Sequence, residues 1–187
     1  MPDPNFQVRT VKAIWSICGP YRRQALAREG KGTVFFVPHS PARRKLGLPP
    51  VCTGVLVVDK IIPDSNTLIK SSQFSKTFKD LYKKDLQEHL KRDRPATKKI
   101  RRKNIVLGSP KSHWFGKRCV KLLPLLRRLK LRDVAYGVEH DRVVRSLSDA
   151  ESKRLYQALV KAWRSARPIE TRRLTTVNHE QACRVCY

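Results

Sequence analysis

The chain has 187 residues, of which 41 are Lys or Arg and 15 are Asp or Glu, giving a formal net charge of +26 and a pI of about 10.6. Like charges at this density repel one another in a compact fold, and a polyanion that neutralises them relieves the repulsion. Nucleic acid is such a polyanion, because its phosphates release condensed counterions when Lys and Arg replace them. The charge therefore favours a nucleic-acid partner and disfavours a small-molecule substrate. A merely basic soluble protein and an anionic membrane surface remain as alternatives.

Composition predicts a modest folded core that carries basic extensions. Apolar residues make up 40% of the chain and charged residues 30%, which is too apolar for a wholly disordered chain and low for one compact globule. The longest apolar run, residues 54–58, fits a buried strand and is too short to cross a bilayer, so no transmembrane segment is expected. Five cysteines are an odd number in a chain without a secretory signal, which argues against a disulfide framework and for a reducing compartment.

Residues 1–32 are interpreted as a basic N-terminal arm, interrupted by Gly19 and Pro20. Between residues 8 and 28, basic side chains are interspersed with apolar ones and no acid occurs. That composition is typical of a mitochondrial import sequence, and it equally fits an arm that contacts RNA. In either case we expect this segment to lie extended or to form an isolated helix.

Residues 33–102 are predicted to form an extension with short strands, an amphipathic helix and a basic connector. β-Branched and aromatic residues indicate strands at 33–37 and 51–62. The loop between these strands holds Arg43, Arg44 and Lys45, which suit phosphate groups. Residues 71–92 carry apolar side chains at helical period. The stripe consists of Phe74, Phe78, Leu81, Tyr82, Leu86 and Leu90, and we expect it to be a packing face.

The densest charge run lies between residues 91 and 103. Its basic residues are Lys91, Arg92, Arg94, Lys98, Lys99, Arg101, Arg102 and Lys103, and Asp93 is its one acid. Because like charges cannot pack against one another and Pro95 interrupts the run, we expect an extended connector. In a chain this basic, a connector that clasps RNA is favoured over a solvated linker.

From residue 104 onward, strand and helix patterns alternate. Strands are expected at 105–107, 133–139 and 169–177. One helix is expected at 117–131, with a kink or restart at Pro124, and a second begins at Ser148, which forms a capping box with Glu151.

The loop between the first strand and the first helix carries candidate RNA contacts. Lys111 and Lys117 can pair with phosphates, and Trp114 or Phe115 can stack on an exposed base. The alternative for both aromatic side chains is packing in the core.

Three segments of this region resemble large-subunit ribosomal protein thirty in its mitochondrial form. They are Asn104-Ile105-Val106-Leu107-Gly108-Ser109-Pro110-Lys111, Trp114-Phe115-Gly116-Lys117-Arg118-Cys119-Val120-Lys121-Leu122-Leu123 and Tyr136-Gly137-Val138-Glu139-His140. The resemblance covers about residues 103–177. It departs from the family in two places: Pro124-Leu125 stands where the family has Gly-Leu, and about four extra residues near 127–130 precede the second strand.

The resemblance implies an α+β fold: a small βαβαβ domain over residues 103–177, with a three-stranded antiparallel sheet and two helices on one face. A long basic N-terminal extension precedes it and a C-terminal tail, residues 178–187, follows. The implied function is that of a structural constituent of the mitochondrial large ribosomal subunit, in the matrix. Its implied partners are large-subunit rRNA and neighbouring mitochondrial ribosomal proteins. The predicted RNA-binding residues are Arg43, Arg44, Lys45, Lys98, Lys99, Arg101, Arg102, Lys103, Lys111, Trp114, Lys117 and Arg118.

The C-terminal tail holds the one candidate metal motif. His179, Cys183 and Cys186 are spaced so that two thiolates and an imidazole can reach one zinc ion. A structural zinc needs a fourth ligand, and no second pair of cysteines with this spacing exists. Free thiols are therefore favoured, and no cofactor is expected.

The sequence offers no catalytic signature. It contains no nucleophile elbow, P-loop or dinucleotide-binding fingerprint, and its few acids lie among Lys and Arg. We therefore do not expect an enzyme. Two alternatives to a ribosomal protein stay open: a basic accessory subunit of a mitochondrial membrane complex, and the RNA-binding part of an RNA-processing assembly.

Overall fold

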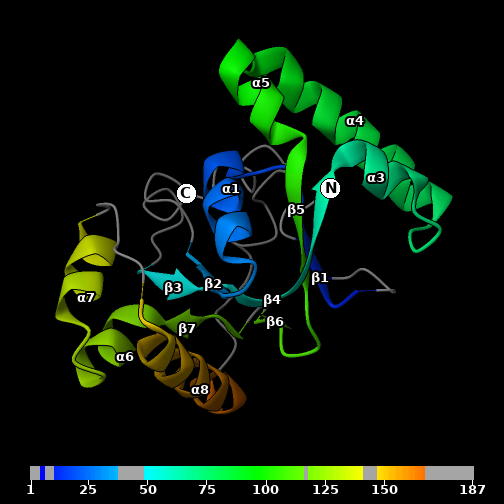
Figure 1. The fold of residues 1–187 in the computed structure, drawn as a ribbon. Helices are drawn as coiled ribbons and strands as arrows, with labels where there is room; N and C mark the ends of the chain where they lie inside the picture. The colour runs from blue at the N-terminus through cyan, green and yellow to red at the C-terminus, as the bar shows by residue number, and fades with distance from the viewer. Residues whose placement is uncertain (1–4, 7–10, 38–48, 116–117, 141–146, 167–187) are drawn as a thin grey trace. The chain divides into compact units, whose positions relative to one another are not determined.

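The computed structural model describes residues 5–6, 11–37, 49–115, 118–140 and 147–166 (Figure 1). Helices and antiparallel sheets combine in these residues, so the chain is α+β in class, as predicted. Two compact units are present. Unit 1 comprises residues 1–34 and 56–113, and unit 2 comprises residues 35–55 and 114–187. The predicted domain at 103–177 is thus divided between the two units.

The first part of the chain contains an antiparallel sheet whose strands differ in length. Its strands are β1 (Ala13–Trp15), β5 (Lys103–Gly108), β4 (Gly54–Asp64) and β2 (Thr33–Phe36), in that order, and β6 (His113–Trp114) also pairs with β4. Ile14 is opposite Leu107, and Ile62 is opposite Ile105. The register of β4 against β5 shifts between Val58 and Lys60. The predicted strands at 33–37, 51–62 and 105–107 are therefore confirmed in outline.

Four helices lie in the described part of unit 1. They are α1 (Pro20–Glu29), α3 (Ser65–Lys70), α4 (Lys76–Arg92) and α5 (Pro95–Arg101). Tyr82, Leu86 and Leu90 follow one another at helical spacing along α4 and are buried in the same hydrophobic cluster as Ile14 and Leu107 of the sheet. The predicted apolar stripe is thus a packing face. Leu81 is the exception, since it is 49% exposed.

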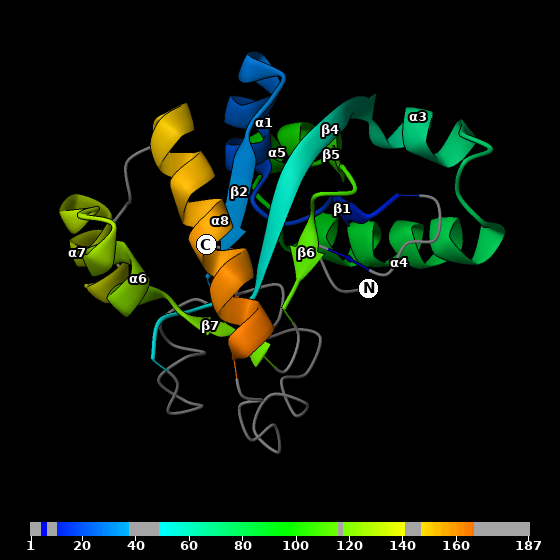
Figure 2. The ribbon, with the colours of Figure 1, turned by 90° about the horizontal axis from the view of Figure 1, so that it is seen from below.

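Within the described residues, unit 2 contains a short antiparallel strand pair and three helices. The three helices are labelled in Figure 2. Its elements are β3 (Val51–Cys52), which pairs with β7 (Val120–Lys121), and α6 (Leu122–Arg128), α7 (Arg132–Glu139) and α8 (Asp149–Ser165). α6 packs against both α7 and α8. Phe115 is buried with its ring centroid 5.7 Å from that of Trp163 on α8. The predicted capping box of Ser148 and Glu151 is confirmed at the start of α8.

The interpretation of residues 1–32 as a separate arm is wrong for the described part of that segment. β1 pairs with β5, and α1 packs against β5 and α5 (Figure 1). Ala13, Ile14 and Ile17 have at most 1% of their surface exposed. The apolar residues between the basic ones complete the sheet unit, and burying them stabilises it by roughly 25 cal/mol per Å² removed from water.

The basic run at 91–103 is also not an extended connector. α4 continues to Arg92, and α5 occupies most of the remainder. Pro95 begins α5 instead of breaking a helix, because a proline in the first helical position lacks only an N–H that has no partner within the helix. Repulsion within the run is reduced because Asp93 forms an ion pair with Arg101.

The predicted strand at 133–139 is helix α7. Alternation of Val134, Tyr136 and Val138 suggests a strand, but the buried positions are Leu131, Val134, Ala135 and Gly137, and Tyr136 is 49% exposed. Spacings of three and four residues mark a helical face, and this face packs on α6. The predicted helix at 117–131 is correspondingly shorter: β7 occupies its start, and α6 begins two residues before Pro124, so this proline lies in the first turn. The strand expected at 169–177 lies outside the described residues.

Candidate nucleic-acid interface

Helix α5 divides the basic run into an inward and an outward set of side chains. Thr97 and Arg101 are four residues apart and share one helical face, and Lys98 and Arg102 share the next face. Arg101 is buried at 6% exposure, whereas Lys98 and Arg102 are exposed. Helical phase therefore decides which cations of the run remain available to a ligand.

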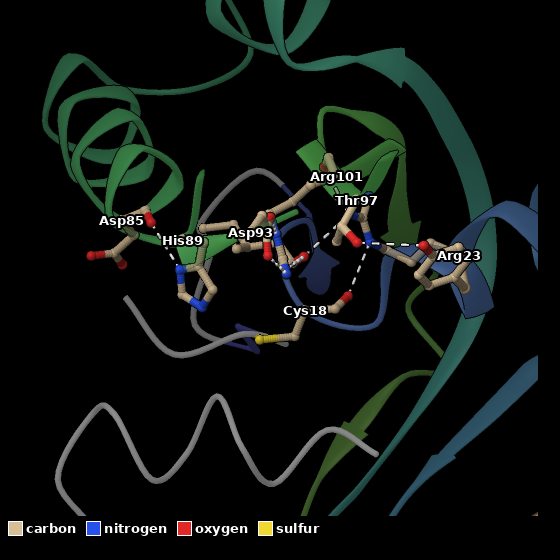
Figure 3. Close-up of polar contacts among 9 residues, drawn as sticks. Cys18, Arg23, Asp85, His89, Asp93, Thr97 and Arg101 are labelled. Carbon is tan, nitrogen blue, oxygen red and sulfur yellow. Dashed lines mark hydrogen bonds and ion pairs between the residues drawn. The ribbon is translucent and has the colours of Figure 1, made fainter. Parts of the chain in front are cut away.

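The Arg101 side chain is buried in unit 1, where its guanidinium is held by hydrogen bonds and an ion pair (Figure 3). Its guanidinium forms a two-pronged ion pair with the Asp93 carboxylate, in which Nη2 donates to Oδ1 at 2.7 Å. Nη1 donates to the carbonyl of Ile17 at 2.8 Å. A guanidinium with these partners cannot also bind a phosphate without breaking them, so the prediction that Arg101 contacts RNA is not supported by its position.

Arg23 of α1 holds the end of α5 in place from the other side. It is fully buried, and its guanidinium donates to backbone carbonyl oxygens. The acceptors are Arg101 at 2.9 Å, Asn104 at 2.9 Å, Cys18 at 3.1 Å, Ile17 at 3.3 Å and Lys103. Because the last carbonyls of a helix lack partners within the helix, a buried arginine at this point satisfies them and fixes the junction between α5 and β5.

The outward set of cations lines an open hollow of about 360 Å³. Its lining residues are Asp64, Ser65, Asn66, Lys98, Lys99, Arg102 and Lys103. The amide of Ser65 donates to the carbonyl of Arg102 at 2.8 Å, which joins the start of α3 to the end of α5. Four cations thus surround one carboxylate, and we call this group of residues the basic hollow.

The Asp64 carboxylate in the basic hollow already accepts hydrogen bonds at the start of α3. Asp64 caps α3, and its Oδ1 accepts hydrogen bonds from the amide of Thr67 at 2.8 Å and from its hydroxyl at 3.1 Å. These bonds, with a contribution from the charge of Lys103, lower the pKa of Asp64. The carboxylate is therefore ionised at neutral pH, and four basic side chains against one carboxylate give the basic hollow a formal net charge of about +3.

The other predicted RNA-binding residues that the structure describes do not line this hollow. Lys111 is exposed on the loop after β5, and its amide donates to the Ser109 hydroxyl at 3.3 Å. Trp114 is 48% exposed, and Arg118 is exposed in unit 2. Four further predicted residues, Arg43, Arg44, Lys45 and Lys117, lie outside the described residues.

The candidate zinc ligands His179, Cys183 and Cys186 also lie outside the described residues. Within the described ranges, no three His, Cys, Asp or Glu side chains are grouped in a way that would hold a metal ion. Cys18, Cys52 and Cys119 are buried free thiols. Burial raises the pKa of Cys52 to about 12 and also raises that of Cys119. In the same residues, no helix has both the length and the apolar composition of a membrane span.

Two features of the interface had no clear signal in the sequence. Nothing in the sequence pattern distinguishes Arg101 from Arg102, and nothing in it links Asp64 to the basic run. Tyr21, which is 60% exposed on α1, lies beside α5 with its hydroxyl 3.4 Å from that of Thr97. The periodicity of α5 could have separated the arginines, had the run been recognised as a helix.

Comparisons of the chain with known protein families, curated proteins and solved structures found no match.

Proposed function

We propose that the chain is an RNA-binding structural protein without catalytic activity, and that the basic hollow is its principal phosphate-binding surface in unit 1. One observation carries the proposal: the folded chain turns four cations of one short run outward around a single hollow. Neighbouring positive charges destabilise a fold unless an anion offsets them. Phosphates of a nucleic acid supply such anions along a line, and Lys and Arg are the side chains that bind them.

We further propose that the RNA is ribosomal and that the chain is a constituent of the mitochondrial large ribosomal subunit. Support comes from the net charge of +26 and from the absence of acids between residues 8 and 28. The likeness to ribosomal protein thirty supports it less, because the segment at 133–139 is helical here. Sedimentation of the protein with mitochondrial large subunits in a magnesium-containing gradient tests this placement.

The basic hollow is tested by the salt dependence of RNA binding. Replacing Lys98, Lys99, Arg102 and Lys103 together with Gln removes up to four phosphate contacts. Each contact contributes about 0.7 to the slope of log affinity against log salt for single strands, so the slope should shrink by about 3. The measurement is fluorescence anisotropy of a labelled RNA over a series of salt concentrations.

A matched control removes the same charge from elsewhere in unit 1. Lys60, Lys70, Lys76 and Lys84 are exposed and do not line the basic hollow. Their joint replacement by Gln should reduce the slope by far less. Equal slopes for the two quadruple variants would show that binding follows net charge alone and would contradict a defined surface.

A gain of affinity provides the opposite test. Asp64→Asn keeps a side chain that caps helices well and removes the one negative charge of the basic hollow. RNA should bind this variant several-fold more tightly at low salt, where charges are least screened.

A competition experiment distinguishes RNA from a membrane partner. Labelled RNA bound to the original protein is displaced either by anionic lipid vesicles or by unlabelled RNA. Displacement by vesicles at a lower phosphate concentration than by unlabelled RNA would favour a membrane partner instead.

A further inference from the structure

Tyr21 is a large aromatic side chain that the fold leaves in water beside the basic run. It is 60% exposed, more than Leu81, Trp114 or Tyr136, the other exposed large apolar side chains among the described residues. An exposed aromatic side chain needs no explanation by itself. Its position on the α1–α5 surface, where its hydroxyl reaches Thr97 of α5, is what gives it a candidate role.

The backbone around Tyr21 fixes where the ring stands. Gly19 adopts a left-handed conformation with φ of 57°, and Pro20 follows as the first residue of α1. A Cβ on Gly19 would lie 2.8 Å from the Trp15 ring, so both the positive φ and the close packing require glycine. Tyr21 is therefore placed by a rigid helix start and not by a mobile loop.

The hydroxyl of Tyr21 lies 3.4 Å from the hydroxyl of Thr97 on α5. This contact engages the edge of the ring and leaves its faces free of that bond. Thr97 directly precedes Lys98, the first cation of the basic hollow, and α5 as a whole is only about 10 Å long at 1.5 Å per residue. The ring thus lies against α5, from which Lys98 and Lys99 extend into the basic hollow on another face of the helix.

We infer that Tyr21 is a stacking platform for an unpaired RNA base whose backbone phosphates occupy the basic hollow. The inference rests on the proposed RNA-binding function and narrows it to single-stranded segments. Bases within a duplex are stacked on one another, whereas unpaired bases are free to stack on aromatic side chains. Single-strand binding surfaces combine aromatic rings with cations that follow the backbone, and a strand that crosses α5 from the basic hollow to Tyr21 would meet both.

The test compares three variants of the full chain on one RNA sequence, presented as a single strand and as a duplex. Tyr21→Ala and Tyr21→Leu remove the ring, and Tyr21→Phe retains the ring without the hydroxyl. Loss of one base-stacking contact corresponds to about a 5- to 150-fold loss of affinity. We expect a loss in this range for the single strand with Ala and Leu, near-normal binding with Phe, and unchanged duplex binding in all three.

Two further readouts separate stacking from a structural effect. The salt slope should stay the same in all three variants, because no cation is removed. A 2-aminopurine base in the single strand should lose fluorescence on binding to the original protein and to Tyr21→Phe, and much less with Tyr21→Ala.

The outcomes for the two proposals are distinct. If Tyr21→Ala binds the single strand normally while the quadruple Lys/Arg variant still lowers the salt slope, the stacking inference is wrong and the basic hollow stands. If the quadruple variant leaves the slope unchanged, the hollow itself is not the RNA site, and a stacking role for Tyr21 beside it fails as well.

Discussion

Arg101 and Arg102 are adjacent residues of the same type, and the structure gives them opposite roles. The first is buried against Asp93 and a backbone carbonyl, and the second lines an open hollow. A buried cation has lost its water and depends on its partners, whereas an exposed cation can exchange water for a phosphate. The count of basic residues in a run therefore overstates the number that bind a ligand.

This difference predicts that Asp93→Asn destabilises unit 1. Both partners of the ion pair are at most 10% exposed, so the substitution leaves the Arg101 charge buried with its main counterion removed. Breaking a buried pair in this way costs about 3–5 kcal/mol. Urea unfolding followed by far-UV circular dichroism measures the change.

An exposed ion pair of the same unit supplies the control. Asp80 lies 3.9 Å from Lys83 on α4, and both side chains are more than half exposed. Asp80→Asn should leave stability almost unchanged, because solvent screens such pairs. Similar destabilisation by both substitutions would argue that Arg101 is not buried in solution.

At the scale of helices, the residues that cap a helix start are the local pattern most closely tied to the observed helix boundaries. Ser148 accepts a hydrogen bond from the amide of Glu151, and the Glu151 carboxylate accepts one from the amide of Ser148. At the starts of α4 and α3, the side chains of Ser75 and Asp64 likewise accept a hydrogen bond from the amide three residues further on. These interactions span three residues, so they form largely independently of the remaining fold.

Removing the cap of α8 should weaken that helix locally. Ser148→Ala eliminates the side-chain acceptor at the helix start, which typically costs about 1 kcal/mol. Hydrogen exchange in α8 (Asp149–Ser165) should accelerate by roughly fivefold on that basis. Ser152→Ala, inside the same helix, is the control and should leave exchange unchanged or slow it slightly, because alanine is the better helix former.

Strand and helix assignments failed where a short segment fitted both periods. In residues 133–139, positions two apart are apolar, and so are positions three and four apart. The secondary structure of such a segment is decided by the element that packs against it, and in unit 2 that element is α6. Local pattern could not identify this partner, because tertiary packing overrides weak propensity.

At the scale of the whole molecule, buried thiols report on each unit separately. Cys18 belongs to unit 1, and Cys52 and Cys119 belong to unit 2. In a Cys183→Ser, Cys186→Ser background, a thiol reagent at pH 8 should label none of the three in the native protein. The thiolate is the reactive form, and burial holds the pKa of Cys52 at about 12.

Combining this labelling with Asp93→Asn tests the division of the chain. Destabilising unit 1 should open Cys18 to the reagent well before Cys52. The stability of unit 2 should also depend on pH, because the pKa of Cys52 is higher in the folded than in the unfolded chain. The contribution of Cys52 to stability is therefore complete below the pKa of the unfolded thiol and declines as pH rises towards 12. Simultaneous labelling of all three thiols would contradict separate opening of the units.

The sequence by itself determined that strands and helices are mixed, the excess of positive charge, the packing stripe of α4 and the capping box of α8. Each of these depends on composition or on residues within two or three helical turns. Tertiary structure alone decided that the N-terminal segment completes a sheet, that Arg23 and Arg101 are interior, and which four cations line one hollow. These outcomes depend on contacts between residues about eighty positions apart, such as Arg23 with Asn104, and a local pattern contains no information about which distant backbone carbonyl will accept a buried guanidinium.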